Sequence, residues 1–219
     1  MEKKTKAKSK LLNLKKIQYN EGADLTLENA ENLFEIAKLC NQKGFAGNGA
    51  SILITSLEEL AKAAYLKIKA HNPHIVVKEL EGFFKYHKVK HGAIIQLYTK
   101  IFKKLPQQQQ EAFGVTILIG IFYIAYFSWK TKQSIALDLE TLRQRGYYVN
   151  FIEDENRWKA PKDLVSSEDF PQFIGLAEKL FENVKKDLFE GKLTDEHTRQ
   201  YIQDLDDENV YFQRSYKTN

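Results

Sequence analysis

The chain has 219 residues, of which 43% are hydrophobic and 12% aromatic, and its formal net charge is +4. This composition is sufficient for a packed core and excludes an intrinsically disordered protein. The single cysteine, Cys40, excludes an internal disulfide and any multi-cysteine zinc or iron–sulfur site. Cys40 itself falls on an apolar helical face and is predicted to lie in the core.

The first 23 residues form a distinct basic segment. Seven lysines and one glutamate occupy residues 1–16, and a terminus of this kind is predicted to be partly disordered. No apolar stretch with a small-residue cleavage site follows it, so no secretory signal is predicted and the expected location is the cytoplasm. Residues 24–205 are predicted to form one helical-bundle domain, and residues 206–219 a tail.

Two long helices are predicted at the start of this domain. The first begins at Asp24 or Thr26, either of which can cap free backbone amides. The glycine-rich residues 44–49 are predicted to form the turn to a second helix over residues 50–70. An apolar stripe indicates one buried face on the second helix, and it comprises Leu53, Leu57, Leu60, Ala61, Ala64 and Ile68.

Three charged residues, Glu58, Glu59 and Lys62, interrupt the second helix in its middle turns. Glu58 and Lys62 are separated by one helical turn, in the orientation in which an exposed pair stabilises a helix. Two interpretations stay open at this point. Either the pair lies on the surface, or the helix carries its charged residues toward a functional site.

The most apolar part of the chain is residues 112–129, which contain no charged residue. This length is at the lower limit for spanning a bilayer. Two glycines, two tyrosines, a threonine and a serine dilute it, however, and a central bundle helix is apolar all round for a simpler reason. A buried helix is therefore the favoured interpretation, and a membrane span is the alternative.

The last third of the chain is predicted to contain helices on either side of a short extended turn. A helix over residues 133–145 is followed by the aromatic, β-prone residues 147–151, which are predicted to be extended. Further helices are predicted within residues 166–205. The expected fold class is therefore all-α.

Two histidines lie in a lysine-rich stretch, residues 85–91. If the stretch is helical, His87 and His91 share one face. Imidazoles that titrate near neutral pH beside fixed positive charge suit phosphate binding or proton transfer. Metal ligands use the same spacing, but the neighbouring lysines oppose a cation, so no metal ion or other cofactor is predicted. A solvated helix face in a basic protein is the alternative interpretation.

Three motifs can be considered together: Ser-Leu-Glu-Glu-Leu-Ala-Lys at residues 56–62, His-Lys-Val-Lys at residues 87–90, and Gly-Tyr-Tyr-Val-Asn at residues 146–150, preceded by arginine. With Trp158 and Pro161 downstream, they resemble the AbiV-type abortive-infection family of bacterial phage defence. That family falls in the HEPN superfamily of nucleic-acid-associated helical bundles. The resemblance covers residues 26–165 and implies a HEPN-like bundle, followed by C-terminal helices in residues 166–205.

The sequence departs from the family pattern at two positions. Asn150 stands where the family tends to have an acid. Ribonucleases of the superfamily carry an arginine four to six residues before a histidine, whereas the nearest analogue here is Lys85 before His91. Arginine holds a phosphate with a rigid two-pronged fork, while lysine offers a mobile point charge.

The resemblance implies an abortive-infection protein that acts in the cytosol as a latent, metal-independent ribonuclease and blocks translation on phage infection. A homodimer, a phage-encoded activator protein and an RNA target are expected with it. The alternative is a non-catalytic module that binds a phage protein or RNA and stops translation by occupancy. A third hypothesis is a membrane-acting effector that uses residues 112–129.

The residues expected to carry this activity fall into three groups. The predicted catalytic residues are His87, His91, Lys62, Glu58 and Arg143. The predicted RNA-binding residues are Lys85, Lys88, Lys90 and Arg145. Further candidates are Glu59, Tyr148 and Asn150.

Overall fold

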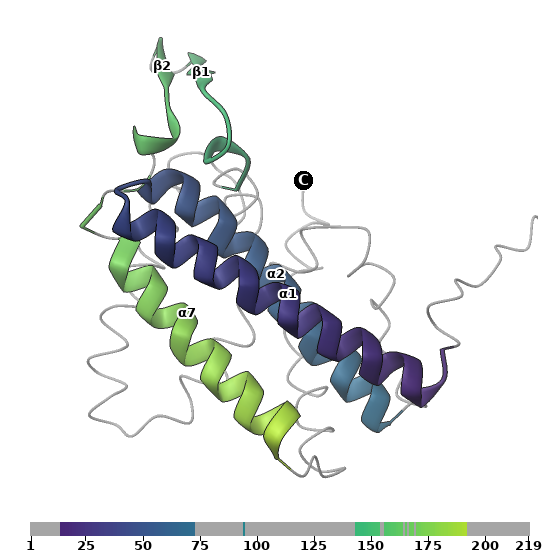
Figure 1. Cartoon of the computed structure of the whole chain (residues 1–219). Helices are drawn as coiled ribbons and strands as arrows, with labels where there is room; N and C mark the ends of the chain where they lie inside the picture. The colour runs from purple at the N-terminus through teal and green to yellow at the C-terminus, as the bar shows by residue number, and fades with distance from the viewer. Residues whose placement is uncertain are drawn as a thin grey trace, which may run out of the picture.

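A pair of long helices is the frame of the structure, which is a computed structural model. It describes residues 14–72, 94, 143–153, 156–163, 165, 167–168 and 170–191. Helix α1 (Lys16–Gln42) and helix α2 (Ala46–His71) are joined by a short turn in which Gly44 has a φ of 76°. That left-handed conformation favours glycine. Figure 1 shows the two helices lying side by side along their length.

Small residues allow the two helices to pack closely. Ala23, Ala30 and Ala37 of α1 are fully buried at seven-residue intervals, which gives a narrow seam along one face of the helix. The buried Ser56 hydroxyl of α2 donates a hydrogen bond of 2.7 Å to the carbonyl of Ala30 across this seam. Most residues of α2 are buried, so other segments must cover it on several sides.

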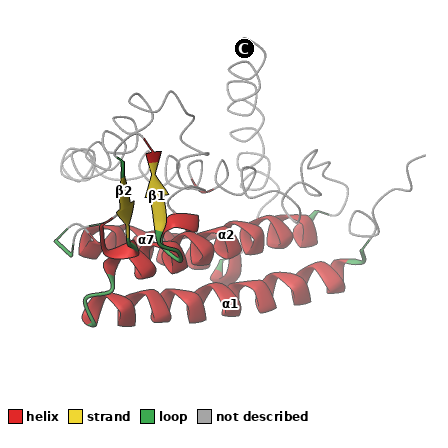
Figure 2. Cartoon of the chain, turned by 90° about the horizontal axis from the view of Figure 1, so that it is seen from above, coloured by secondary structure: helices red, strands yellow, loops and turns green. Residues whose placement is uncertain are grey.

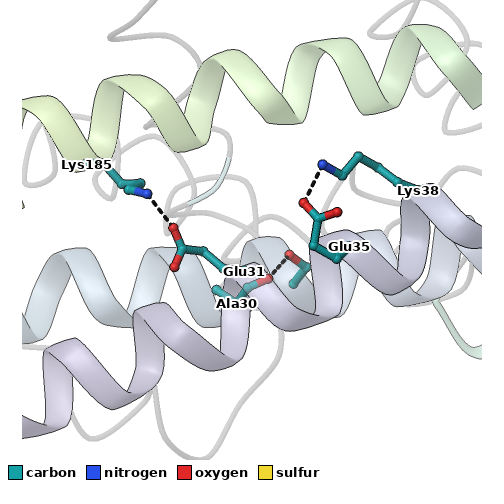
Figure 3. Close-up of polar contacts among 6 residues, drawn as sticks. Ala30, Glu31, Glu35, Lys38 and Lys185 are labelled. Carbon is teal, nitrogen blue, oxygen red and sulfur yellow. Dashed lines mark hydrogen bonds and ion pairs between the residues drawn. The ribbon is translucent and has the colours of Figure 1, made fainter.

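A third helix, α7 (Phe170–Val184), packs against this pair and continues into a π-helical segment, η4 (Lys185–Glu190). The rings of Phe34 and Phe181 stack with centroids 4.9 Å apart. Farther along, Lys185 Nζ lies 2.6 Å from Glu31 Oε1 (Figure 3). This hydrogen bond and the charge of Glu31 raise the pKa of Lys185. Because α7 meets α1 at Phe34 first and then η4 meets it at Glu31, α7 runs antiparallel to α1.

The small sheet is a β-hairpin of β1 (Asn150–Ile152) and β2 (Arg157–Lys159). The strands are antiparallel, and Phe151 is opposite Trp158 in the register. A short 3₁₀ helix, η3 (Pro161–Asp163), follows β2. Figures 1 and 2 show the hairpin standing away from the helices. The described residues are thus mostly helical, which confirms the predicted all-α class.

The first helix begins earlier than the sequence pattern predicted. It starts at Lys16 instead of Asp24 or Thr26, and the Thr26 hydroxyl donates within the helix to the carbonyl of Gly22. The apolar seam continues toward the N-terminus through the buried residues Tyr19 and Ala23, so packing on α2 extends the helix.

The predicted glycine-rich turn is wrong in extent, because α2 already begins at Ala46 and includes Gly47 and Gly49. The predicted apolar stripe of this helix is confirmed, and all of its members are buried. Cys40, predicted to be in the core, is only half-buried. Burial nonetheless raises the pKa of its thiol.

The extended conformation predicted for residues 147–151 holds only in part, since β1 begins at Asn150 and pairs with a strand, β2, that was not predicted. Residues 85–91, 112–129, 133–142 and 194–205 lie outside the described residues, and so do the predictions made for them. Among the helices that are described, none is long and apolar enough to span a bilayer.

The central position of α2 leads to a prediction about stability. Leu60→Ala is expected to lower the free energy of unfolding by about 2–5 kcal/mol, because it leaves a cavity around a fully buried side chain. Leu39→Ala is the matched control, since Leu39 is 55% exposed on α1 and its truncation should cost less than about 0.5 kcal/mol. Urea denaturation followed by circular dichroism measures both variants. Equal losses would contradict this packing.

Candidate functional site

The candidate site is formed where residues 143–148 lie against the first half of α2. Residues 143–145 are helical, and the chain then turns at Gly146, which is buried. The Asn48 side-chain amide donates a hydrogen bond of 2.9 Å to the carbonyl of Gly146. A Cβ atom added at Gly146 would lie 1.7 Å from Ser51 Oγ and 2.5 Å from the carbonyl oxygen of Gly47. Only glycine therefore allows this approach.

Two further segments pack against the glycines of α2. A Cβ atom at Gly47 would lie 1.7 Å from the carbonyl oxygen of Pro161, and one at Gly49 would lie 2.5 Å from the ring of Phe170. The first turns of α2 thus carry a set of small residues, Gly47, Gly49 and Ser51, which we call the glycine seat. Residue Gly146, η3 and the start of α7 pack against it. This packing explains the glycine-rich sequence that local rules assigned to a turn.

Glu58 and Arg143 form the electrostatic centre of the site. Glu58 is 1% exposed, and Arg143 Nε lies 3.9 Å from its Oε1 atom. Burying a carboxylate is costly unless a cation or hydrogen bonds compensate for the lost hydration. The Arg143 side chain, 19% exposed, is well placed to supply that compensation, and Glu58 in turn favours one orientation of the guanidinium.

Glu59 and Lys62 form a separate cluster on the same helix. Lys62 Nζ lies 2.5 Å from Glu59 Oε1, and the Asn29 side-chain amide donates to Glu59 Oε2 at 3.2 Å. Glu59 therefore contacts both α1 and the next turn of α2. The interpretation of Glu58 and Lys62 as an exposed pair is wrong, because Glu58 is buried and Lys62 forms an ion pair with Glu59.

An open pocket of about 430 Å³ adjoins the Glu58–Arg143 pair, and it is lined by Arg143, Gln144, Tyr147 and Tyr148. Arg143 thus lies between a buried carboxylate and a solvent-accessible hollow. A guanidinium held in this way can bind the oxygens of a phosphate or carboxylate. The tyrosines add aromatic surface and hydroxyl groups, so the pocket has the chemistry to bind an anion that carries a flat ring.

The structure brings together only some of the predicted site residues. Arg145 follows Arg143 in the same helical turn, and Tyr148 lines the pocket. The Asn150 side chain donates to the carbonyl of Tyr148 at 2.9 Å, so it stabilises the turn into β1. The predicted residues that lie outside the described part of the chain are Lys85, His87, Lys88, Lys90 and His91.

Several residues of the site were not predicted from the sequence. Asn48 anchors Gly146, and Gln144 and Tyr147 line the pocket. The only sequence signal for the seat was the run of small residues at the start of α2, in which Gly47 and Ser51 share one side of the helix and Gly49 lies on the other. Over the described ranges, no cluster of three His, Cys, Asp or Glu side chains is arranged to hold a metal ion.

A helical bundle whose central helix carries the charged motif at residues 56–62 corresponds to the HEPN type. A family model described as AbiV, of this type, matches residues 18–182. The chain therefore belongs to the AbiV family of HEPN proteins, as the resemblance predicted. No curated protein and no solved structure matches it. Membership in this family points to abortive-infection defence against phage.

The seat on α2 can be tested with two glycine substitutions of opposite expected sign. Gly146→Ala should lower the free energy of unfolding by about 1–3 kcal/mol, because the new methyl group overlaps Ser51 and Gly47. Gly175→Ala in α7 meets no atom within 4 Å and should raise that free energy by about 0.5–1 kcal/mol through helix propensity. Urea denaturation of both variants is the measurement, and a neutral Gly146→Ala would contradict the close contact.

Proposed function

We propose that this protein is an abortive-infection effector that cleaves RNA without a metal ion when phage infects the cell, and so stops translation. The observation that carries the proposal is the double role of Arg143, which faces the buried Glu58 and also lines the pocket. A cation oriented by a buried carboxylate is pre-organised for a phosphate, because little reorganisation is needed when charge develops on it.

RNA carries its own nucleophile, so this reaction needs no external one. A base removes the proton of a ribose 2′-hydroxyl, whose oxygen attacks the adjacent phosphorus, and an acid protonates the departing 5′-oxygen. The products are a 2′,3′-cyclic phosphate and a 5′-hydroxyl. In the proposal His87 and His91 serve as base and acid, while Arg143 stabilises the negative charge of the phosphorane.

In the proposal, Arg143 also supplies the guanidinium that is missing from the stretch around the histidines. Lys85 precedes His91 where ribonucleases of the superfamily have arginine. A guanidinium from a different segment can supply the planar fork that lysine lacks. In this arrangement Lys85, Lys88, Lys90 and Arg145 attract the RNA backbone, whereas the charge of Lys62 is compensated by its ion pair with Glu59.

A nuclease that stops host translation must be inactive before infection. The proposal therefore includes a phage-encoded protein that activates it. It also includes a symmetric homodimer, which would place two sets of lysines and histidines near one another. The family resemblance motivates both features, and latency motivates the activator in particular.

RNA integrity is the direct test of this function. RNA from cells that express the protein should show discrete cleavage products after infection and remain intact before it. Purified, activated protein should give 2′,3′-cyclic phosphate ends in the presence of EDTA, and His87→Ala or His91→Ala should abolish them. Intact RNA with arrested translation would overturn the nuclease and support a binder that acts by occupancy. Dye entry before translational arrest would support a membrane effector.

The Glu58–Arg143 pair gives a prediction about rate. Glu58→Gln keeps the shape of the side chain but removes its charge, so Arg143 should lose its fixed orientation and RNA cleavage should slow by about 10–100-fold. Glu35→Gln is the matched control, since Glu35 forms an exposed pair with Lys38 on α1 and should leave the rate unchanged (Figure 3). Initial rates on one labelled RNA measure both, and equal rates for Glu58→Gln and wild type would refute the positioning role.

A further inference from the structure

The β-hairpin exposes an unusual amount of aromatic surface. Trp158 is 69% exposed, Tyr148 66% and Phe151 44%. An isolated two-stranded hairpin is only marginally stable in water, and large exposed apolar patches usually mark interaction sites. This surface is therefore a candidate binding site that the cleavage mechanism does not use.

The register of the hairpin gathers the aromatic side chains on one face. Phe151 and Trp158 are directly opposite each other, and their ring centroids lie 5.4 Å apart in an edge-to-face arrangement. Neighbouring residues in each strand point to the other face, which places Arg157 and Lys159 there. One face is thus an aromatic platform, the other face carries Arg157 and Lys159, and the sequence between the strands contains the acidic residues Glu153, Asp154 and Glu155.

This platform directly follows the Arg143 pocket in the chain. Tyr147 and Tyr148 line the pocket, and β1 begins two residues after Tyr148. Figure 1 shows the hairpin rising from the same end of the α1–α2 pair that holds the glycine seat. A chain-like ligand that enters the pocket can therefore extend directly onto the hairpin.

Two properties identify the chemistry of such a ligand. Exposed rings bind the flat faces of unpaired nucleobases by stacking, whatever the base. Arg157 and Lys159 flank Trp158 in β2, and cationic side chains beside a stacking ring can attract the phosphates on either side of a stacked base. A duplex cannot use the platform, because its base faces are already stacked.

We propose that Trp158 and Phe151 form a stacking subsite for unpaired nucleotides, so that the hairpin selects single-stranded RNA and guides it to the Arg143 pocket. This inference rests on the proposed nuclease function, because it names the form of RNA that the same site takes. The hairpin residues are specificity residues and do not contact the reacting phosphate.

Binding of a fluorescent RNA 12-mer to the full chain in EDTA tests the subsite through anisotropy. Trp158→Ala should weaken binding of the single strand by about 5–100-fold, the range found for loss of one base–aromatic stack. Trp158→Tyr should retain most of the affinity. The wild type should bind the duplex of the same sequence at least about tenfold more weakly than the single strand.

Two controls establish whether base stacking accounts for the change in affinity. An abasic 12-mer keeps the phosphates but has no bases, so wild type and Trp158→Ala should bind it equally. Phe45→Ala removes another exposed ring, 59% exposed on the α1–α2 turn, and should leave RNA affinity unchanged. Thermal melts of the variants check that folding is intact.

The outcomes distinguish this inference from the proposed function. Single-strand affinity unaffected by Trp158→Ala would overturn the subsite, and cleavage that persisted in that variant would leave the nuclease standing. Trp158-dependent binding without any cleavage would support the subsite and overturn the nuclease. Loss of self-association in Trp158→Ala, with RNA affinity unchanged, would overturn the subsite and show that the hairpin is a protein interface.

Discussion

Close contact between backbone segments at the first turns of α2 is the constraint on which the rest of the described structure depends. Gly47, Gly49 and Ser51 leave no bulky side chain on this part of the helix, so Gly146, Pro161 and Phe170 can all reach it. These contacts tolerate no added methyl group. They set the position of the Arg143 pocket, of the hairpin that follows and of the start of α7. Small residues on two sides of the first turns of α2 thus organise segments that are about 100 residues away in the sequence.

The buried carboxylate of Glu58 adds an electrostatic constraint to this steric one. A buried ion pair seldom adds much net stability, because desolvation offsets the attraction between the charges. Separating the two charges is nevertheless strongly unfavourable, because it leaves the buried carboxylate uncompensated. Arg143 is therefore favoured in positions near Glu58. Glu58 therefore contributes more to the position of the Arg143 side chain than to the stability of the fold. Gly146 holds the backbone of residues 143–148 against α2, and Glu58 lies beside Arg143, the cationic side chain that lines the pocket among the described residues.

The sequence predicted the features that depend on local rules. The all-α class, the buried stripe of α2 and the end of α2 near residue 70 follow from helical periodicity. Features that depend on contacts distant in sequence were missed. Gly47 and Gly49 looked like a turn, because nothing local indicates that Pro161 and Phe170 need the space. The burial of Glu58 could not be decided, because its one-turn spacing to Lys62 is also the pattern of a surface pair, and β2 was too short to show alternation.

The pocket and the hairpin are both positioned by the packing of Gly146 on α2, and this affects how a bound RNA strand would be placed. Both follow Gly146 directly in the chain, and the Asn150 amide bonded to the Tyr148 carbonyl stiffens the few residues between them. A nucleotide held on the aromatic platform is therefore located relative to Arg143 by a short, hydrogen-bonded segment instead of a flexible linker. Misplacement of reacting groups by about 1 Å can cost a hundredfold in rate, so under the proposed nuclease function a rigid connection of this kind would help to place the RNA, although the hairpin would take no part in proton transfer. The glycine seat would then be the feature that fixes the position of the proposed stacking subsite relative to Arg143.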